Sequence, residues 1–201
     1  MTDHATEPAT ASTVRAQAIG MLAGTGFGGI WAMTGLAGRH GGYASLLGLV
    51  ALAVLAALVV AALDLWRIAR HAGLPQAPAD GRNRHTGRGF LLILVAEIVA
   101  MNLAAWALYP RHMACLMPAI ALIVGLHFVP LAALLRRRHL YIAAIAMSLA
   151  GLAGIAAIAL GADAATVHAL LGAACALALW TTCFLSWRST KLRLASRAIT
   201  A

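Results

Sequence analysis

Charged residues are scarce in this sequence. They make up 10% of its 201 residues, and only six of them are acidic, whereas about a quarter of the residues in a soluble domain carry charge. Hydrophobic residues account for 62% of the chain. So few charges do not fit a soluble fold, whose exposed positions are mostly taken by charged and polar residues. The composition therefore excludes an ordinary soluble domain.

Cysteines and catalytic motifs are also few. The three cysteines show no C-x-x-C spacing, which excludes a disulfide framework and a cysteine-based zinc site. Neither H-E-x-x-H nor G-x-S-x-G occurs, so the usual signatures of a metalloprotease or a serine hydrolase are missing. A b-type haem would need two histidines facing one plane, but His127 and His168, the histidines within the apolar runs, are expected nearer opposite faces of the membrane. We therefore predict that the protein is not an enzyme and holds neither a metal nor another cofactor.

Long uncharged runs are what the sequence does contain. Each is about 20 residues or more, enough for a helix to cross a hydrocarbon core of about 30 Å. We predict an all-α polytopic membrane protein, a six-transmembrane-helix bundle forming a single membrane domain, with a loop at 71–88 and tails at 1–14 and 188–201. The six runs cover residues 17–37, 43–66, 89–109, 113–135, 140–161 and 164–186.

The positive charges lie almost entirely on one side of these predicted helices. Only Arg39 and Arg111 fall on the other side. Because cytoplasmic loops of membrane proteins are enriched in Lys and Arg, this bias predicts that the loop at 71–88 and both termini are cytoplasmic. Anionic lipid of the bilayer accounts for the net charge of +9, so no nucleic-acid partner is predicted. The thirteen cations of the basic side are Arg15, Arg67, Arg70, Arg82, Arg84, Arg88, Arg136, Arg137, Arg138, Arg188, Lys191, Arg193 and Arg197.

The segment GTGFGG at residues 24–29 matches the dinucleotide-binding pattern G-x-G-x-x-G. That pattern requires a preceding strand and water around the phosphates, but here it lies in the middle of an apolar run, where an open strand edge is excluded. The spacing of Gly20, Gly24 and Gly28 instead places small residues on one helix face, where a neighbouring helix can approach closely. Gly154, in register with Ala146 and Ala150, predicts a second face of this kind.

One carboxylate and one histidine fall deep inside neighbouring runs. Glu97 lies eight residues from the cytoplasmic end of the third run, and His127 lies eight residues from the same side of the fourth. Both are therefore about 12 Å deep, and the short turn between the runs makes the two helices neighbours. Pro130 cannot donate a hydrogen bond to the Leu126 carbonyl, which is expected to kink the helix there. Asn102 completes the set of candidate polar residues, although it points about 140° away from Glu97 around the helix.

Two interpretations of these residues stay open. Ionisable side chains in membranes are costly and frequently functional, so Glu97 and His127 are candidates for a proton site. Alternatively, Glu97 is a neutral, hydrogen-bonded group that holds the third and fourth helices together.

The segment GLHFVPLAALLRRRHLYI at 125–142 carries a G-x-H-x-x-P pattern formed by Gly125, His127 and Pro130, and Tyr141 opens the next helix. This arrangement resembles the fourth-helix motif of an uncharacterised family of small six-helix bacterial membrane proteins. The resemblance implies a bacterial inner-membrane protein with six helices. It implies no activity, because none is assigned to the family.

The sequence leaves two functions open. The first is transport of a small solute or ion, with proton coupling through Glu97 and His127 and with a homo-oligomer compensating for the small pore that six helices can form. The second is a non-catalytic partner, assembly factor or sensor that docks another membrane protein through small-residue helix faces.

Overall fold

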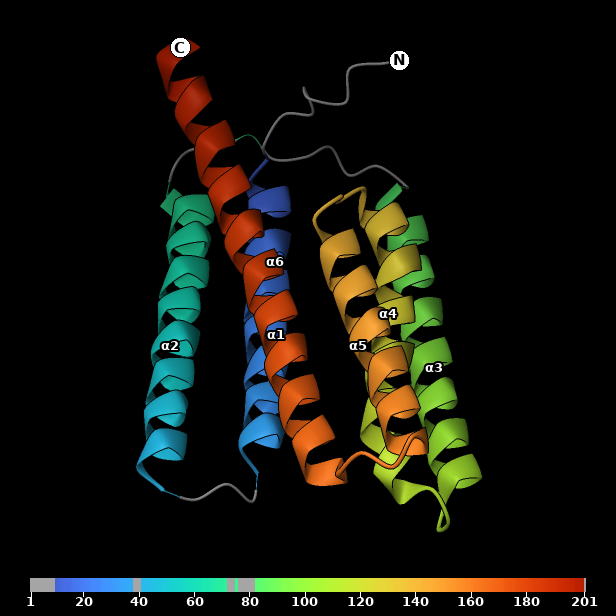
Figure 1. The fold of residues 1–201 in the computed structure, drawn as a ribbon. Coiled ribbons are helices and arrows are strands. Elements are labelled where there is room, and N and C mark those ends of the chain that lie inside the picture. Colours follow the sequence, from blue (N-terminus) through green and yellow to red (C-terminus); the bar gives the residue numbers. More distant parts are fainter. Residues whose placement is uncertain (1–9, 38–40, 72–74, 76–81, 201) are drawn as a thin grey trace.

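The computed structural model describes residues 10–37, 41–71, 75 and 82–200. These residues form six α-helices and no strand (Figure 1). All six helices are long and apolar enough to cross a membrane, which confirms the predicted all-α six-helix membrane bundle. The helices are α1 (Ala11–Leu36), α2 (Gly42–His71), α3 (Arg82–Leu108), α4 (Leu116–Leu135), α5 (Leu140–Ala159) and α6 (Ala164–Thr200), and a short 3-10 turn, η1 (Met113–Cys115), precedes α4.

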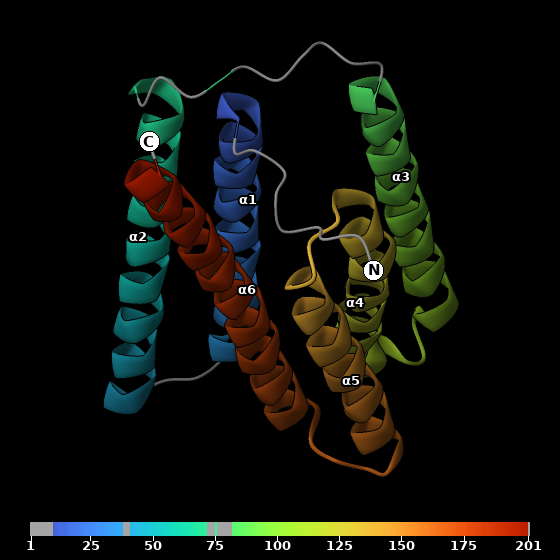
Figure 2. The same ribbon diagram turned by 90° about the horizontal axis from the view of Figure 1, so that it is seen from above.

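The helices form two groups. Helix α1 packs between α2 and α6, while α4 packs between α3 and α5, and the groups meet along α5 and α6 (Figures 1 and 2). Within the described residues, α3 packs only on α4 and on η1, so it lies at the edge of the bundle. The beginning of α1 and the end of α6 lie at the same end of the bundle (Figure 1), which we call the terminal end.

Several helices are longer than the apolar runs that predicted them. Helix α6 continues through the predicted tail at 188–201 to Thr200, and at 37 residues it is about 55 Å long, more than a bilayer's hydrocarbon core requires. Helix α3 begins at Arg82, inside the predicted loop 71–88. Helix α1 begins at Ala11, inside the predicted tail 1–14, because a capping box at Thr10 starts it there. Hydropathy indicates which residues lie in lipid, whereas a helix extends as far as its backbone hydrogen bonds continue. The apolar runs are therefore shorter than the helices that contain them.

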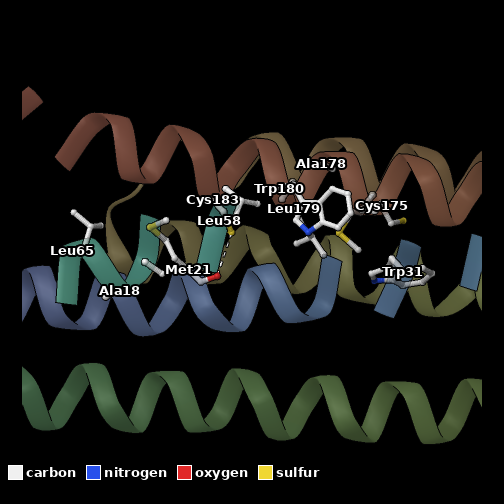
Figure 3. Close-up of a cluster of buried hydrophobic side chains, with 14 of the residues drawn as sticks. Ala18, Met21, Trp31, Leu58, Leu65, Cys175, Ala178, Leu179, Trp180 and Cys183 are labelled. Atoms are coloured by element: carbon white, nitrogen blue, oxygen red, sulfur yellow. Dashed lines mark hydrogen bonds between the residues drawn. The ribbon is translucent and has the colours of Figure 1, made fainter. Parts of the chain in front are cut away.

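Helices α1 and α6 approach each other most closely where both carry glycine. A Cβ at Gly172 would lie 2.5 Å from the backbone nitrogen of Gly35, so the two backbones are in direct contact. Further along the same interface, Gly28 lies against the Trp180 ring and Gly24 lies against the Cys183 sulfur. Trp180 and Cys183 belong to a cluster of buried apolar side chains, most of which come from α1, α2 and α6 (Figure 3).

Gly20 does not take part in this interface. It is exposed, and nothing outside its own helix lies within 4 Å of where its Cβ would be. The buried residues of α1, including Met21, Gly28 and Gly35, recur every seven residues, as expected where two helices pack along a shared seam. A series with strict four-residue spacing drifts off that seam, which is why Gly20 falls outside it.

Hydrogen bonds between helices fix the register of α1 on α6. The Gln17 side-chain amide donates to the Ser186 carbonyl at 2.6 Å and lies 2.7 Å from the Ser186 hydroxyl. The Trp180 indole donates to the Thr25 carbonyl at 3.3 Å. These bonds satisfy polar groups that hydrocarbon cannot solvate.

Glycines also bring α4 and α5 together. A Cβ at Gly125 would lie 2.5 Å from the Ser148 backbone nitrogen, and one at Gly151 would lie 2.7 Å from the Pro118 carbonyl. Gly154, predicted from sequence as a packing residue, lies against Pro118 and Val167. The helix that carries His127 is therefore held rigidly by α5 on the side away from α3.

The glycine contacts predict opposite effects for two similar substitutions. Gly172→Ala should lower the free energy of unfolding by about 1–3 kcal/mol, because a methyl group there meets backbone that cannot move aside. Gly20→Ala should raise it by about 0.5–1 kcal/mol, because alanine favours a helix interior and nothing obstructs it. Unfolding by SDS in mixed micelles, followed by circular dichroism, measures both. Equal effects of the two substitutions would contradict the packing described here.

Candidate functional site

Glu97 of α3 and His127 of α4 lie in contact. His127 Nδ1 is 3.1 Å from Glu97 Oε2, and the two side chains are only 11% and 13% exposed. The residues that sequence analysis placed at one depth on adjacent helices are thus brought together. Within the described residues, no other acidic side chain lies in contact with a histidine.

The pair lies close to the middle of the membrane span. The apolar part of α3 runs from Gly87 to Leu108, so Glu97 is about 15 Å from either end at 1.5 Å per residue. An ionised carboxylate is most costly at this depth, where neither water nor headgroups reach it. The imidazole of His127 therefore takes the place of solvent for the carboxylate.

The helical repeat explains why Glu97 faces α4. The half-buried residues of α3 recur every three or four positions, as one face of a helix requires. This face consists of Leu94, Glu97, Met101, Ala104 and Leu108. On α4, the Phe128 ring stands edge-on to the His127 imidazole at a centroid distance of 5.6 Å, so that aromatic surface surrounds part of the polar pair.

The contact is close without being a well-aligned hydrogen bond. Although Nδ1 lies 3.1 Å from the carboxylate oxygen, the direction of approach does not satisfy hydrogen-bond geometry, and Nδ1 has no other hydrogen-bond partner in the described part of the chain. The distance is nevertheless within the range of a hydrogen bond. A small rotation of the imidazole would align this bond, whereas a bond from Nδ1 to any other group would require a helix to move. A buried nitrogen in this position is poised to exchange a proton with the carboxylate.

This arrangement can hold a proton in different ways. The pair carries one proton either as glutamate with imidazolium or as glutamic acid with neutral imidazole, and movement of that proton over one hydrogen bond interconverts the two. A second proton gives glutamic acid with imidazolium. A proton can therefore move between the two groups without displacement of a helix, whereas exchange of a proton with water requires access to this depth. Within the described residues, no group of three or more His, Cys, Asp or Glu side chains that could hold a metal ion occurs.

Two of the predicted site residues lie elsewhere. Asn102 is exposed on the far side of α3, where its amide donates to the Ile98 carbonyl at 2.8 Å. Pro130 is exposed on α4, and the helix is continuous through it to Leu135. Asn102 points about 140° away from Glu97 around α3, whereas Pro130 lies three residues beyond His127, on a neighbouring part of the same face of α4.

A groove of about 690 Å³ lies in the other helix group, between α2 and α6. Its lining is almost wholly apolar and includes Leu47, Val54, Leu177, Trp180 and Phe184. It is separate from Glu97 and His127, which belong to α3 and α4. A polar solute would find few hydrogen-bonding partners there, so acyl chains of the bilayer are its natural filling.

Sequence analysis missed the polar contacts that cross between distant helices. Besides Gln17 and Ser186, these include the ion pair between Lys191 and Asp64 at 3.0 Å and the contact of the His168 imidazole with the Ala114 carbonyl at 2.7 Å. The partners are separated by 127 and 54 residues. No local spacing in the sequence signals such contacts, because they depend on which helices become neighbours.

Positive groups converge on His139 at the terminal end. Helix α4 ends at Leu135 and is capped by Arg136, whose left-handed backbone (φ 52°) directs the chain into the turn carrying Arg137 and His139. Burial, followed by the positive charges of Arg137 and Arg193, lowers the pKa of His139 to about 4. His139 is therefore neutral at physiological pH, and protonating it would place a further positive charge beside two arginines.

This arrangement predicts a loss of stability in acid. The pKa of His139 is lower in the folded protein than the ordinary value of 6.5, so its contribution is complete above about pH 6.5 and is lost as the pH falls towards 4. His139→Gln should remove this part of the pH dependence, as measured by thermal unfolding between pH 4 and 8. His112→Gln, at the opposite end of the bundle, is the matched control. If both variants kept the wild-type pH profile, His139 would not be the responsible group.

Comparison with known proteins gives no relative from which a function could be transferred. No family model, curated protein or solved structure matches the chain. The resemblance of the segment 125–142 to a bacterial family therefore stays a prediction. What the described residues establish is a multi-pass membrane protein with six candidate membrane-spanning helices.

Proposed function

We propose that this protein transports a small solute or ion across the membrane and that transport is coupled to proton exchange at Glu97 and His127. One observation carries the proposal: a carboxylate and an imidazole lie 3.1 Å apart at the middle of two apolar helices. Ionisable groups at this depth are costly to maintain and commonly mark proton or ion pathways.

Packing alone does not explain these two residues. Helices α1 and α6 are held by glycine contacts and by neutral hydrogen bonds such as that of Gln17 with Ser186. Helices α4 and α5 are likewise held through Gly125 and Gly151. A neutral amide would join α3 to α4 as well as an acid does, so an ionisable pair supports a role that requires a proton.

The position of α3 at the edge of the bundle supports a movement that would expose the Glu97 carboxylate to water. Helix α3 packs only on α4 and η1 among the described residues, whereas α4 is also held by α5. A small displacement of α3 relative to α4 would expose the Glu97 carboxylate to water without disturbing the rest of the bundle. Such motions of whole helices occur in microseconds to milliseconds, fast enough for a transport cycle.

The charge distribution supports an orientation for this transporter. Among the described residues, most cations lie at the terminal end, including Arg67, Arg137 and Lys191, while Arg111 lies at the opposite end. We accordingly place the terminal end in the cytoplasm, by the positive-inside bias, and assign the protein to a bacterial inner membrane.

The alternative function, docking of another membrane protein through small-residue faces, has less support. Gly24, Gly28 and Gly154 are already in contact with Cys183, Trp180 and Pro118 of the same chain. These small-residue faces are therefore used to build the bundle and are not open to a partner.

Infrared difference spectroscopy of the reconstituted protein tests the proposal. Between about pH 5 and about pH 9, where a working proton site must titrate, the protonated-carboxyl band of Glu97 should change in intensity and should be missing in Glu97→Gln. His127→Asn should shift the pH at which the band changes, because it removes the neighbouring base.

Asp64→Asn provides the matched control, since Asp64 is the other carboxylate within the helices and pairs with Lys191. This variant should leave the Glu97 band and its pH dependence unchanged. A Glu97 band that is present but constant throughout the range would show a permanently protonated structural group and would overturn the proposal.

A further inference from the structure

Helix α3 has two opposite faces, and the described part of the chain packs on only one of them. At 100° per residue, Glu97 and its neighbours face α4. Leu92, Val95, Val99, Asn102 and Trp106 lie on the other side of the helix, within an arc of about 80° centred opposite Glu97. We call these five residues the α3 seam. Figures 1 and 2 show α3 at the edge of the bundle, with the other helices on one side of it.

The α3 seam has the spacing of a helix–helix interface. Its members follow each other at intervals of three, four, three and four residues, as residues on one face of a helix do, so a second helix can pack along them. All five are exposed, and Trp106 is 81% exposed. No residue of the apolar part of α3 is buried.

Asn102 is the polar member of this seam. It lies six residues, about 9 Å, from the end of α3 at Leu108, within the hydrocarbon part of the span. Its amide nitrogen donates to the Ile98 carbonyl of its own helix, and its side-chain oxygen makes no hydrogen bond among the described residues. Apart from Glu97, which faces α4, every other residue between Gly89 and Leu103 is apolar or glycine. Lipid cannot satisfy the amide oxygen, because acyl chains offer no hydrogen-bond donor.

We propose that the α3 seam binds the α3 seam of a second copy of this chain. Both copies insert in the same direction, so the two-fold axis of such a dimer runs along the membrane normal and the two α3 helices are parallel. Identical residues then face each other at the same depth, and Asn102 meets Asn102 of the second copy. A carboxamide is both donor and acceptor, so each amide satisfies the oxygen of the other.

A second copy fits this surface better than lipid or an unrelated helix does. Lipid leaves the Asn102 oxygen without a donor, and an unrelated helix would need a donor at one specific depth. A single asparagine within an apolar heptad fixes both register and pairing of two identical helices. The dimer does not depend on the proposed transport function, because the seam and Glu97 occupy opposite faces of α3.

Disulfide cross-linking in proteoliposomes tests the orientation of the interface. Cys115, which is half-buried, is first replaced by serine, while Cys175 and Cys183 stay in the core. Val95→Cys should then give a covalent dimer on mild oxidation, because identical seam residues face each other. Ala96→Cys, one residue further on and also exposed, points about 100° away from Val95 and should remain monomeric. Equal cross-linking at both positions, or none at Val95, would overturn the proposal.

Substitution of Asn102 tests what holds the dimer. Asn102→Leu should weaken dimerisation roughly 5- to 30-fold, the effect of losing hydrogen bonds between helices in a membrane, as measured by energy transfer between labelled copies diluted in lipid. Asn102→Gln should retain most of the association because it keeps the amide.

The helix content and the Glu97 carboxyl band serve as internal controls in this experiment. Asn102 is exposed and its hydrogen bond stays within α3, so neither substitution should change the helix content or the Glu97 carboxyl band. An unchanged dimer in Asn102→Leu, or a wild-type protein that stays monomeric at high protein-to-lipid ratio, would contradict the assignment. Failure of the dimer alone would leave the proton site intact, whereas failure of the carboxyl titration alone would leave the dimer intact.

Discussion

Direct contact between the backbones of α1 and α6 at Gly35 and Gly172 supports the whole arrangement of helices. In a bilayer, apolar side chains gain nothing by leaving lipid for one another, so helices associate through close packing and hydrogen bonds. Glycine at both positions permits the closest approach in this interface, and Trp180 and Cys183 then fit over the neighbouring glycines of α1. Since α6 also packs on α5, this contact joins the group containing α2 to the group containing α4.

Polar groups within the helices follow from the same constraint. Gln17 bonds to Ser186, Trp180 to the Thr25 carbonyl, and Glu97 lies against His127. Each of these contacts joins two helices that also meet through apolar or glycine packing. Asn102 differs because it bonds only within its own helix and faces outwards. This outward-facing polar group is the observation on which the proposed dimer rests.

Sequence reasoning succeeded where the bilayer imposes a direct requirement. The six spans could be predicted because an apolar run must be long enough to cross the hydrocarbon core. The contact of Glu97 with His127 could be predicted from equal depth and a short connecting turn. Both arguments depend on position along the membrane normal, which the sequence encodes residue by residue.

Sequence reasoning failed where the answer depends on which helices become neighbours. Gly20 has the same local spacing as Gly24 and Gly28, and only the placement of α6 shows that it lies off the seam. Gln17 and Ser186 are 169 residues apart, so nothing near either residue signals their contact. The continuation of α6 to Thr200 was missed for a different reason: apolarity ends where the lipid ends, while the helical hydrogen bonds continue in water.

The two faces of α3 constrain each other's function. In a monomer, α3 is held by α4 and η1 among the described residues and is the most easily displaced element of the bundle. In the proposed dimer, the two α3 helices would lie at the centre and hold each other through Asn102, so the displacement that exposes Glu97 would instead fall to α4, with α5 following because Gly125 and Gly151 tie the two together. Each copy would keep its own proposed proton site on the side of α3 away from the two-fold axis. The proposed dimer would therefore provide a fixed support against which each copy moves, and the six helices of one chain would not need to enclose a central pore.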